Sequence, residues 1–158
     1  MNEAEFDRRV RSLEPNMYRA ARAILRSDAD AADAMQNAVF SAWRKLPGLR
    51  DETLFEPWLM RILINASKDM LRRRKRRMET PLSFEEQTFA KDAGRDLDVR
   101  AALEQLPDKN RLCVALHHLD GYSVPQIARM LRLPQTTVKG RIREGIKKMK
   151  RTLEEETP

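Results

Sequence analysis

Apolar residues recur every three or four positions through most of this chain, which is the spacing of one face of an α-helix. A first stripe opens the chain and continues after Pro15; its members are Phe6, Val10, Leu13, Met17, Ala21, Ile24 and Leu25. A second helix is predicted to be N-capped by Asp28 or Asp30 and to end at Pro47–Gly48. Its apolar positions are Met35, Val39, Ala42, Trp43 and Leu46.

A third helix is predicted to begin near Pro57, after a loop from Leu49 to Glu56. Its apolar positions are Trp58, Leu59, Ile62, Leu63, Ala66, Met70 and Leu71. The helix finishes in a run of consecutive cations, Arg72 to Arg77. Cations are favoured near the negative C-terminal pole of a helix. This run exceeds what capping needs, and its members repel one another unless an acidic partner neutralises them.

The pattern changes from Met78 to Arg95, where apolar residues are few and acidic residues are in excess. Such a composition is typical of a flexible linker. Helical spacing resumes near Asp96, and no segment shows the alternation of a β-strand. The sequence therefore predicts an all-α fold of two small helical domains. The predicted parts are a helical bundle at 1–77, a linker at 78–95, a four-helix module at 96–153 and an acidic tail at 154–158.

The segment from Tyr122 to Lys150 has the most specific local pattern. Ser123 and Gln126 have the spacing of a capping box. Arg132–Leu133 then interrupts the apolar run, and Pro134 suits the first turn of a second helix. Two short helices joined in this way are typical of a helix-turn-helix, which lays its second helix in the DNA major groove.

The second of these helices has one apolar face and one basic face. The cations are Lys139, Arg143, Lys147 and Lys150, with Arg141 near the edge of their face. At the start of the helix, where base edges are usually contacted, stand Gln135, Thr136 and Thr137. The longer cations suit phosphates, which position a protein without specifying a sequence. The alternative to a DNA-recognition helix is an ordinary amphipathic terminal helix, which would also have an apolar stripe and a basic face.

The charge balance also favours a nucleic-acid partner. The 158 residues carry 31 Lys and Arg against 24 Asp and Glu, a net charge of +7. An acidic membrane surface is the second candidate partner. The N-terminus has no apolar signal-peptide core, and the apolar run Trp58 to Ile64 is short and interrupted by Arg61. A cytoplasmic protein is therefore expected.

Catalytic and metal-binding patterns are weak. Cys113 is the single cysteine, so no internal disulfide can form. Cys113 and His117 share a helical face, but a complete ligand set is missing, so a buried thiol is favoured over a metal site. No Ser-His-Asp arrangement, glycine-rich phosphate loop or carboxylate pair is evident. We expect no enzyme activity, no metal, no cofactor and no small-molecule substrate.

A second polar group lies on the predicted third helix. Asn65, Asp69 and Arg72 or Arg73 share one face. Amides and guanidiniums contact bases, and Trp58 can stack on an unpaired base. Core packing explains Trp58 better, however, and a solvated helix surface also explains Asn65. On the second helix, a polar face indicates by itself only solvent exposure; it contains Asp33, Gln36 and Asn37.

Three long segments carry a family resemblance. They are DADAADAMQNAVFSAWRKL from Asp28, FEPWLMRILINASKDMLRRRKRR from Phe55, and LPDKNRLCVALHHLDGYSVPQIARMLRLPQTTVKGRIREGIKKMK from Leu106. Taken together, they resemble the extracytoplasmic function (ECF) sigma factors of bacterial RNA polymerase. The matches cover nearly the whole chain, in the order of the family and with its linker between them.

The resemblance implies that the first domain binds the polymerase clamp and opens the minus-ten promoter element, and that the second binds the minus-thirty-five element. It implies that the clamp helices of the largest polymerase subunit meet Asp33, Gln36, Asn37, Phe40 and Arg44. It implies that the loop Leu49 to Leu54 receives a flipped base, and that Arg72 to Arg77 contact backbone phosphates. The implied minus-ten contacts are Leu49, Arg50, Asp51, Asn65, Asp69, Arg72, Arg73 and Arg76.

For the minus-thirty-five element, the implied contacts are Gln135, Thr136, Thr137, Lys139, Gly140, Arg141, Arg143 and Lys147. The resemblance also implies an anti-sigma factor, often membrane-anchored, that occludes these surfaces and can hold the protein at the membrane. Four positions depart from the family pattern: Ala32, Gln126, Gly140 and Glu144. Gly140 and Glu144 bear on minus-thirty-five recognition, because Glu can accept from cytosine N4 but also repels phosphate.

Two other functions remain open at this point. A helix-turn-helix regulator that binds duplex DNA without polymerase shares the C-terminal pattern, but it leaves Asp28 to Arg77 unexplained. A sigma mimic that sequesters an anti-sigma factor is the second. Such mimics often lose their DNA-contacting cations, whereas this chain keeps them at Arg72 to Arg77 and at Lys139 to Lys150.

Overall fold

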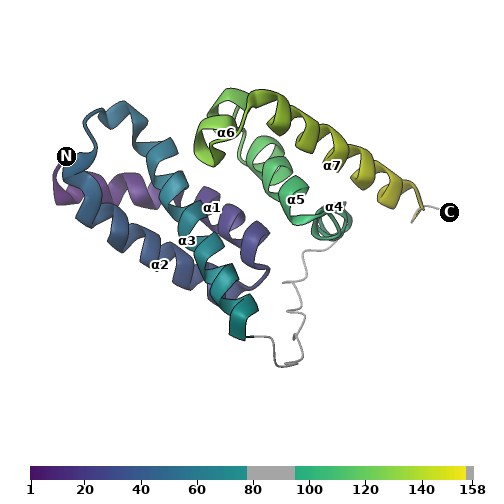
Figure 1. Cartoon of the computed structure of the whole chain (residues 1–158), viewed down its shortest axis with the longest axis horizontal. Coiled ribbons are helices and arrows are strands. Elements are labelled where there is room, and N and C mark those ends of the chain that lie inside the picture. Colours follow the sequence, from purple (N-terminus) through teal and green to yellow (C-terminus); the bar gives the residue numbers. More distant parts are fainter. Residues whose placement is uncertain (78–94, 156–158) are drawn as a thin grey trace. The chain divides into compact units, whose positions relative to one another are not determined.

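The computed structural model describes residues 1–77 and 95–155, and these residues form helices without any strand (Figure 1). The all-α prediction is confirmed. The chain divides into two compact units, Met1–Glu85 and Glu86–Pro158, and each is described by itself. All of the predicted linker except Arg95 lies outside the described residues, and so do the last three residues of the predicted tail.

The N-terminal unit consists of three long helices that pack against one another: α1 (Glu3–Leu25), α2 (Asp28–Lys45) and α3 (Phe55–Arg77) (Figure 1). The side that α2 buries consists of small residues, Ala31, Ala34, Ala38 and Ala42. Small side chains at helical spacing allow α1 and α3 to approach α2 closely. The large core side chains come from these neighbours and include Met17, Leu25, Leu59, Met60, Leu63 and Ile64.

Local capping explains where these helices begin. Asn2 caps α1 by accepting from the Glu5 amide at 2.8 Å. The predicted cap of α2 is wrong: Ser27 accepts from the Asp30 amide at 3.2 Å, and Asp28 and Asp30 occupy the first turn. There the two carboxylates suit the positive pole of the helix.

Short 3-10 turns follow α2 at Leu46–Gly48 (η1) and precede α3 at Glu52–Leu54 (η2). The third helix therefore begins at Phe55, two residues before the predicted Pro57. The first helix runs through Pro15, which is exposed, and ends where Arg26 adopts a left-handed conformation with φ 57°.

The C-terminal unit contains α4 (Arg95–Glu104), α5 (Asp108–Val114), α6 (Val124–Leu131) and α7 (Gln135–Glu155) (Figure 1). A π-turn, η3 (Ala115–Leu119), extends α5. The predicted capping box is confirmed, because Ser123 accepts from the Gln126 amide at 3.3 Å while the Ser123 amide donates to Gln126 Oε1 at 2.8 Å. Arg132, left-handed at φ 54°, ends α6 and turns the chain toward α7.

The helices α5 and α7 pack closely at a point where α7 has no side chain of its own. Gly145 is buried in α7, and a Cβ built on it would lie 2.6 Å from Val114 Cγ2. Asn110 ties the same two helices together, since its Nδ2 donates to the Arg141 carbonyl at 2.9 Å. The fully buried Arg111 donates to the Leu106 carbonyl at 2.8 Å and also pairs with Asp108. This packing fixes α7 on its unit and leaves the other side of the helix exposed.

Candidate nucleic-acid interface

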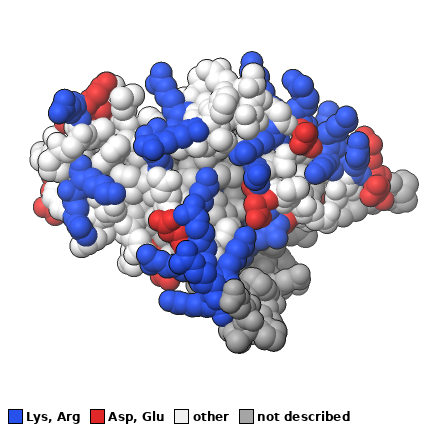
Figure 2. Space-filling view, in the orientation of Figure 1, with Lys and Arg blue, Asp and Glu red and all other residues white. Residues whose placement is uncertain are grey.

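Basic side chains gather over the C-terminal end of α3 and over part of α7 (Figure 2). At the end of α3, Arg72, Arg73 and Arg76 are exposed. Arg74 differs, because its Nη1 donates to the Leu25 carbonyl at 2.9 Å and to Asp30 Oδ2 at 2.8 Å. The cation run is therefore not uniform: Arg74 ties α3 to the end of α1 and the start of α2, whereas Arg72, Arg73 and Arg76 reach solvent.

The polar face predicted on α3 is present as an exposed surface. Asn65 and Asp69 both lie at exposed positions, one helical turn apart. Asp69 Oδ1 accepts from Arg72 Nη1 at 3.0 Å, which orients the guanidinium along the helix. Trp58 is half-buried and its ring lies 5.8 Å from that of Phe55. Trp58 thus belongs in part to the packing of the helix start.

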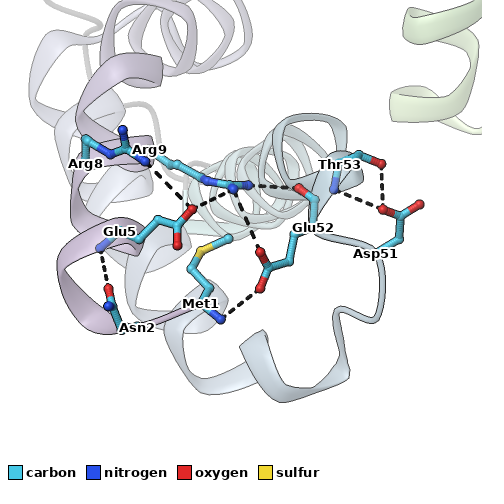
Figure 3. A network of polar contacts seen from close by, with 8 residues as sticks. All are labelled: Met1, Asn2, Glu5, Arg8, Arg9, Asp51, Glu52 and Thr53. Carbon is cyan, nitrogen blue, oxygen red and sulfur yellow. Dashed lines mark hydrogen bonds and ion pairs between the residues drawn. The ribbon is translucent and has the colours of Figure 1, made fainter.

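The loop between α2 and α3 presents several of the predicted minus-ten residues. Leu49 is half-buried, whereas Arg50, Asp51 and Leu54 are exposed. The Asp51 carboxylate accepts from the Thr53 amide at 3.0 Å and from the Thr53 hydroxyl at 2.6 Å (Figure 3). These hydrogen bonds lower the pKa of Asp51, because they stabilise its charged form. The loop therefore holds the charged Asp51 carboxylate in one orientation, next to the exposed residues Arg50 and Leu54.

The long helix α7 presents the residues predicted for base and phosphate contact. Gln135, Thr136, Lys139, Arg143 and Lys147 are exposed, and Thr137 and Gly140 are half-buried. A Cβ added at Gly140 would meet nothing within 4 Å. Arg141 lies about half a turn of the helix away from Lys139 and is half-buried beside α5. Lys139, Arg143 and Lys147 thus share one side of the helix, and Arg141 stands apart from them.

The residues predicted to face a protein partner form one exposed stripe along α2. Asp33, Gln36, Asn37, Phe40 and Arg44 are all exposed, and Phe40 is 64% exposed. The Arg44 guanidinium carbon lies 5.7 Å from the centre of the Phe40 ring. Phe40 adjoins other apolar side chains, Val39 and Trp43, and apolar residues that lie side by side on a surface mark a contact site.

Sequence reasoning missed a groove beside this stripe. The groove lies between α1 and α2 and has a volume of about 1120 Å³. Apolar side chains line it, including Phe6, Val10, Met17, Met35, Val39, Phe40 and Trp43, and acidic ones come from α1, namely Glu3, Asp7 and Glu14. Trp43 was predicted to be in the apolar stripe of the second helix, yet 42% of it is exposed and one edge packs on Phe6 at 5.1 Å between ring centres.

The cysteine and histidines lie within the C-terminal unit. Cys113 is buried. His117 Nδ1 lies 2.8 Å from the Tyr122 carbonyl. The pKa of His118 is lowered mainly by partial burial and to a smaller extent by the charge of the neighbouring His117. Across 1–77 and 95–155, no group of three or more His, Cys, Asp or Glu is arranged to hold a metal ion. In the same ranges, every helix is too short or too polar to cross a membrane.

Comparisons with known proteins agree with this geometry. Residues 9–77 match the family Sigma-70 region 2, and residues 96–149 match Sigma-70, region 4. The ECF RNA polymerase sigma factor SigM of Mycobacterium tuberculosis is 34% identical over 150 residues, which cover 94% of this chain and 76% of that protein.

Two solved structures have similar folds. One is the sigma factor RpoE in complex with the anti-sigma factor NepR from Bartonella quintana, with a TM-score of 0.85, 22% identity and coverage of 95% of this chain and 97% of that chain. The other is CnrH in complex with the cytosolic domain of CnrY, with a TM-score of 0.74, 26% identity and coverage of 99% and 92%. At 22% identity, the first likeness concerns the fold alone.

Proposed function

Because the chain belongs to the extracytoplasmic function (ECF) sigma factors of the sigma-70 family, we propose that it binds core RNA polymerase and directs it to specific promoters. One observation carries this proposal: regions 2 and 4 of the family follow one another along the chain, and each coincides with a compact unit that exposes a basic surface. The proposed contribution is binding and strand opening, with no reaction catalysed by this chain.

At the minus-ten element, the proposed contacts are the loop Leu49 to Leu54 and the exposed face of α3. A flipped base costs a few kcal/mol to unstack and unpair. Hydrogen bonds from the loop and from Asn65 would offset that cost, since a hydrogen bond contributes about 0.5–1.5 kcal/mol and one to a charged group about 1.5–3 kcal/mol. Arg72, Arg73 and Arg76 would bind the phosphates of the same strand, which makes the affinity depend on salt.

At the minus-thirty-five element, α7 is the proposed recognition helix. Its exposed first turn supplies Gln135 and Thr136, which suit base edges. Lys139, Arg143 and Lys147 would contact phosphates on one side of the groove. Glu144 is exposed near these cations, so it would favour a cytosine at the matching position and disfavour close phosphate contact.

Replacing Lys139 with alanine is expected to weaken binding to a minus-thirty-five duplex similarly across sequences. Loss of one phosphate contact should lower the slope of log affinity against log salt by about 1. Fluorescence anisotropy over a salt series measures this slope. Lys148 is the matched control, because it is exposed on the other side of α7. An equal loss for K148A and K139A would contradict the proposed face.

For core polymerase, the proposed contact is the exposed stripe of α2. Replacing Phe40 with alanine is expected to weaken binding to core polymerase at least about tenfold, because truncating an aromatic residue at the centre of an interface often costs 2 kcal/mol or more. Phe40 is 64% exposed, so the melting temperature of the free protein should hardly change. Binding is measured by competition with another sigma factor. Unchanged affinity for core polymerase would exclude Phe40 from the interface.

Trp43 provides the contrasting variant on the same helix. Its ring packs edge-on against Phe6, so Trp43→Ala should lower the melting temperature as well as affinity. The pair of variants thus separates a contact residue from one that also supports the fold.

An anti-sigma factor is the proposed regulator. One of the two similar structures, RpoE with NepR, is a sigma factor in complex with an anti-sigma factor. The groove between α1 and α2 has an apolar lining and acidic side chains from α1, which suit an apolar helix with basic flanks. A partner seated there would cover Phe40 and so compete with core polymerase. Attachment of such a partner to the membrane remains a prediction.

A further inference from the structure

Arg9 links α1 to the loop that precedes α3, across 43 residues of sequence. Its Nη1 donates to the Glu52 backbone carbonyl at 2.9 Å, and its Nη2 donates to Glu5 Oε1 at 2.8 Å (Figure 3). Nη2 also lies 3.9 Å from the Glu52 carboxylate. The guanidinium carbon sits 5.7 Å from the centre of the Phe55 ring. One side chain therefore contacts both the backbone of the loop and the first residue of α3.

The bond to a backbone carbonyl matters more than the ion pairs. Arg9, Glu5 and Glu52 are partly exposed, at 30%, 32% and 47%, so water weakens the attraction between their charges. A hydrogen bond to the carbonyl instead restrains the conformation of the loop at Glu52. The neighbouring Asp51–Thr53 bonds are local to the turn and do not tie it to the rest of the unit. The Glu52 side chain itself is also held by the Met1 amino group at 2.8 Å.

We propose that Arg9 is a positioning residue for base selection at the minus-ten element. This inference rests on the proposed function of the loop Leu49 to Leu54. Arg9 holds the loop from the α1 side, so the shape that the loop offers to an unpaired base depends on a residue that does not itself contact DNA. Loss of the bond would let Glu52 and the adjoining Asp51 shift, and a misplaced contact discriminates poorly between bases.

Arg8 is a matched control on the same helix. It has the same charge, its side chain is 76% exposed, and its contact with Glu5 is a long 3.8 Å (Figure 3). Arg8→Ala therefore makes the same change of net charge as Arg9→Ala without touching the loop. Arg9→Lys is the conservative variant, because an ammonium group can reach the carbonyl but cannot present the same planar fork to both partners.

The first experiment is transcription with core polymerase from a library randomised over the minus-ten element. For R9A, the preference for the favoured base should fall about two- to tenfold at one position, the factor that one hydrogen bond contributes. R9K should lie between R9A and the unchanged protein, and R8A should match the unchanged protein. A uniform loss of transcripts in R9A, with the same base preferences, would show that Arg9 is merely structural and overturn the inference.

Hydrogen exchange on the free protein supplies a second readout that needs no polymerase. The amides of Thr53 and Leu54 bond within the loop, to Asp51, so their exchange reports on its order. R9A should speed their exchange while core amides of α3 stay protected, and R8A should not. Unchanged loop exchange in R9A would overturn the inference even if the library gave no transcripts. A transcript failure of the unchanged protein would instead contradict the proposed function.

Discussion

Replacing Gly145 with alanine is expected to destabilise the C-terminal unit by about 1–3 kcal/mol, the usual cost of an extra methyl group in a packed core. The new Cβ would lie 2.6 Å from Val114 Cγ2 and 3.4 Å from Leu106 Cδ1. Valine has little freedom to turn away, because its χ1 angle is strongly restricted in a helix. The two helices would have to separate at their crossing, where Asn110 also holds them together.

Gly140 makes a clean control for this prediction. It lies in the same helix, but an added Cβ would meet nothing within 4 Å. Gly140→Ala should therefore stabilise the unit by up to about 1 kcal/mol through helix propensity alone. Thermal unfolding followed by circular dichroism measures both variants. Equal shifts in the same direction would mean that α5 does not approach α7 as closely as described.

The second large effect is expected from removing Arg73 and Arg76 together. Both side chains are exposed at the basic end of α3. If each binds one phosphate, the double alanine variant should lower the slope of log affinity against log salt by about 2, although the factor is smaller on a single strand. The fall in affinity should be largest at low salt and should affect all minus-ten sequences alike.

Arg74→Ala is the contrasting variant in the same run of cations, because it should lower stability. Arg74 bonds to the Leu25 carbonyl and to Asp30, so its loss should destabilise the N-terminal unit by about 1–3 kcal/mol. The double variant R73A/R76A should leave unfolding nearly unchanged. The affinity of R73A/R76A for the minus-ten strand is measured over a salt series, by titrating a fluorescent single-stranded oligonucleotide with the variant bound to polymerase. A salt slope that stays constant in R73A/R76A would contradict the phosphate role.

The sequence predicted the helix-turn-helix well because its signals are local. A capping box and a break before Pro134 each need only a few neighbouring residues, and the box is present between Ser123 and Gln126. The N-cap of α2 was mispredicted at the same level of detail. Three residues that can cap, Ser27, Asp28 and Asp30, stand close together, and spacing does not choose among them.

Tertiary contacts were harder to predict. The bonds of Arg74 and Arg9 reach across 49 and 43 residues, and within the sequence each is one cation among several. The exposure of Trp43 could not be read from its spacing, because α2 buries alanines and leaves Trp43 at the edge of a groove. The roles given to the DNA-contacting and polymerase-contacting residues, and the domain boundaries, stay predictions.

The two other functions can be weighed against these findings. A duplex-binding regulator does not account for the match of residues 9–77 to Sigma-70 region 2. A sigma mimic needs only the surfaces that an anti-sigma factor covers, yet exposed cations remain at both basic surfaces. Neither alternative is favoured.

Promoter-specific initiation is the central claim, and transcription in vitro tests it most directly. Bacterial core polymerase is incubated with a pooled promoter library, with and without the purified protein, and the transcripts are sequenced. We expect transcripts that need the protein and share both a minus-ten and a minus-thirty-five element. Absence of such transcripts, with a folded protein and a core enzyme that responds to another sigma factor, would contradict the claim.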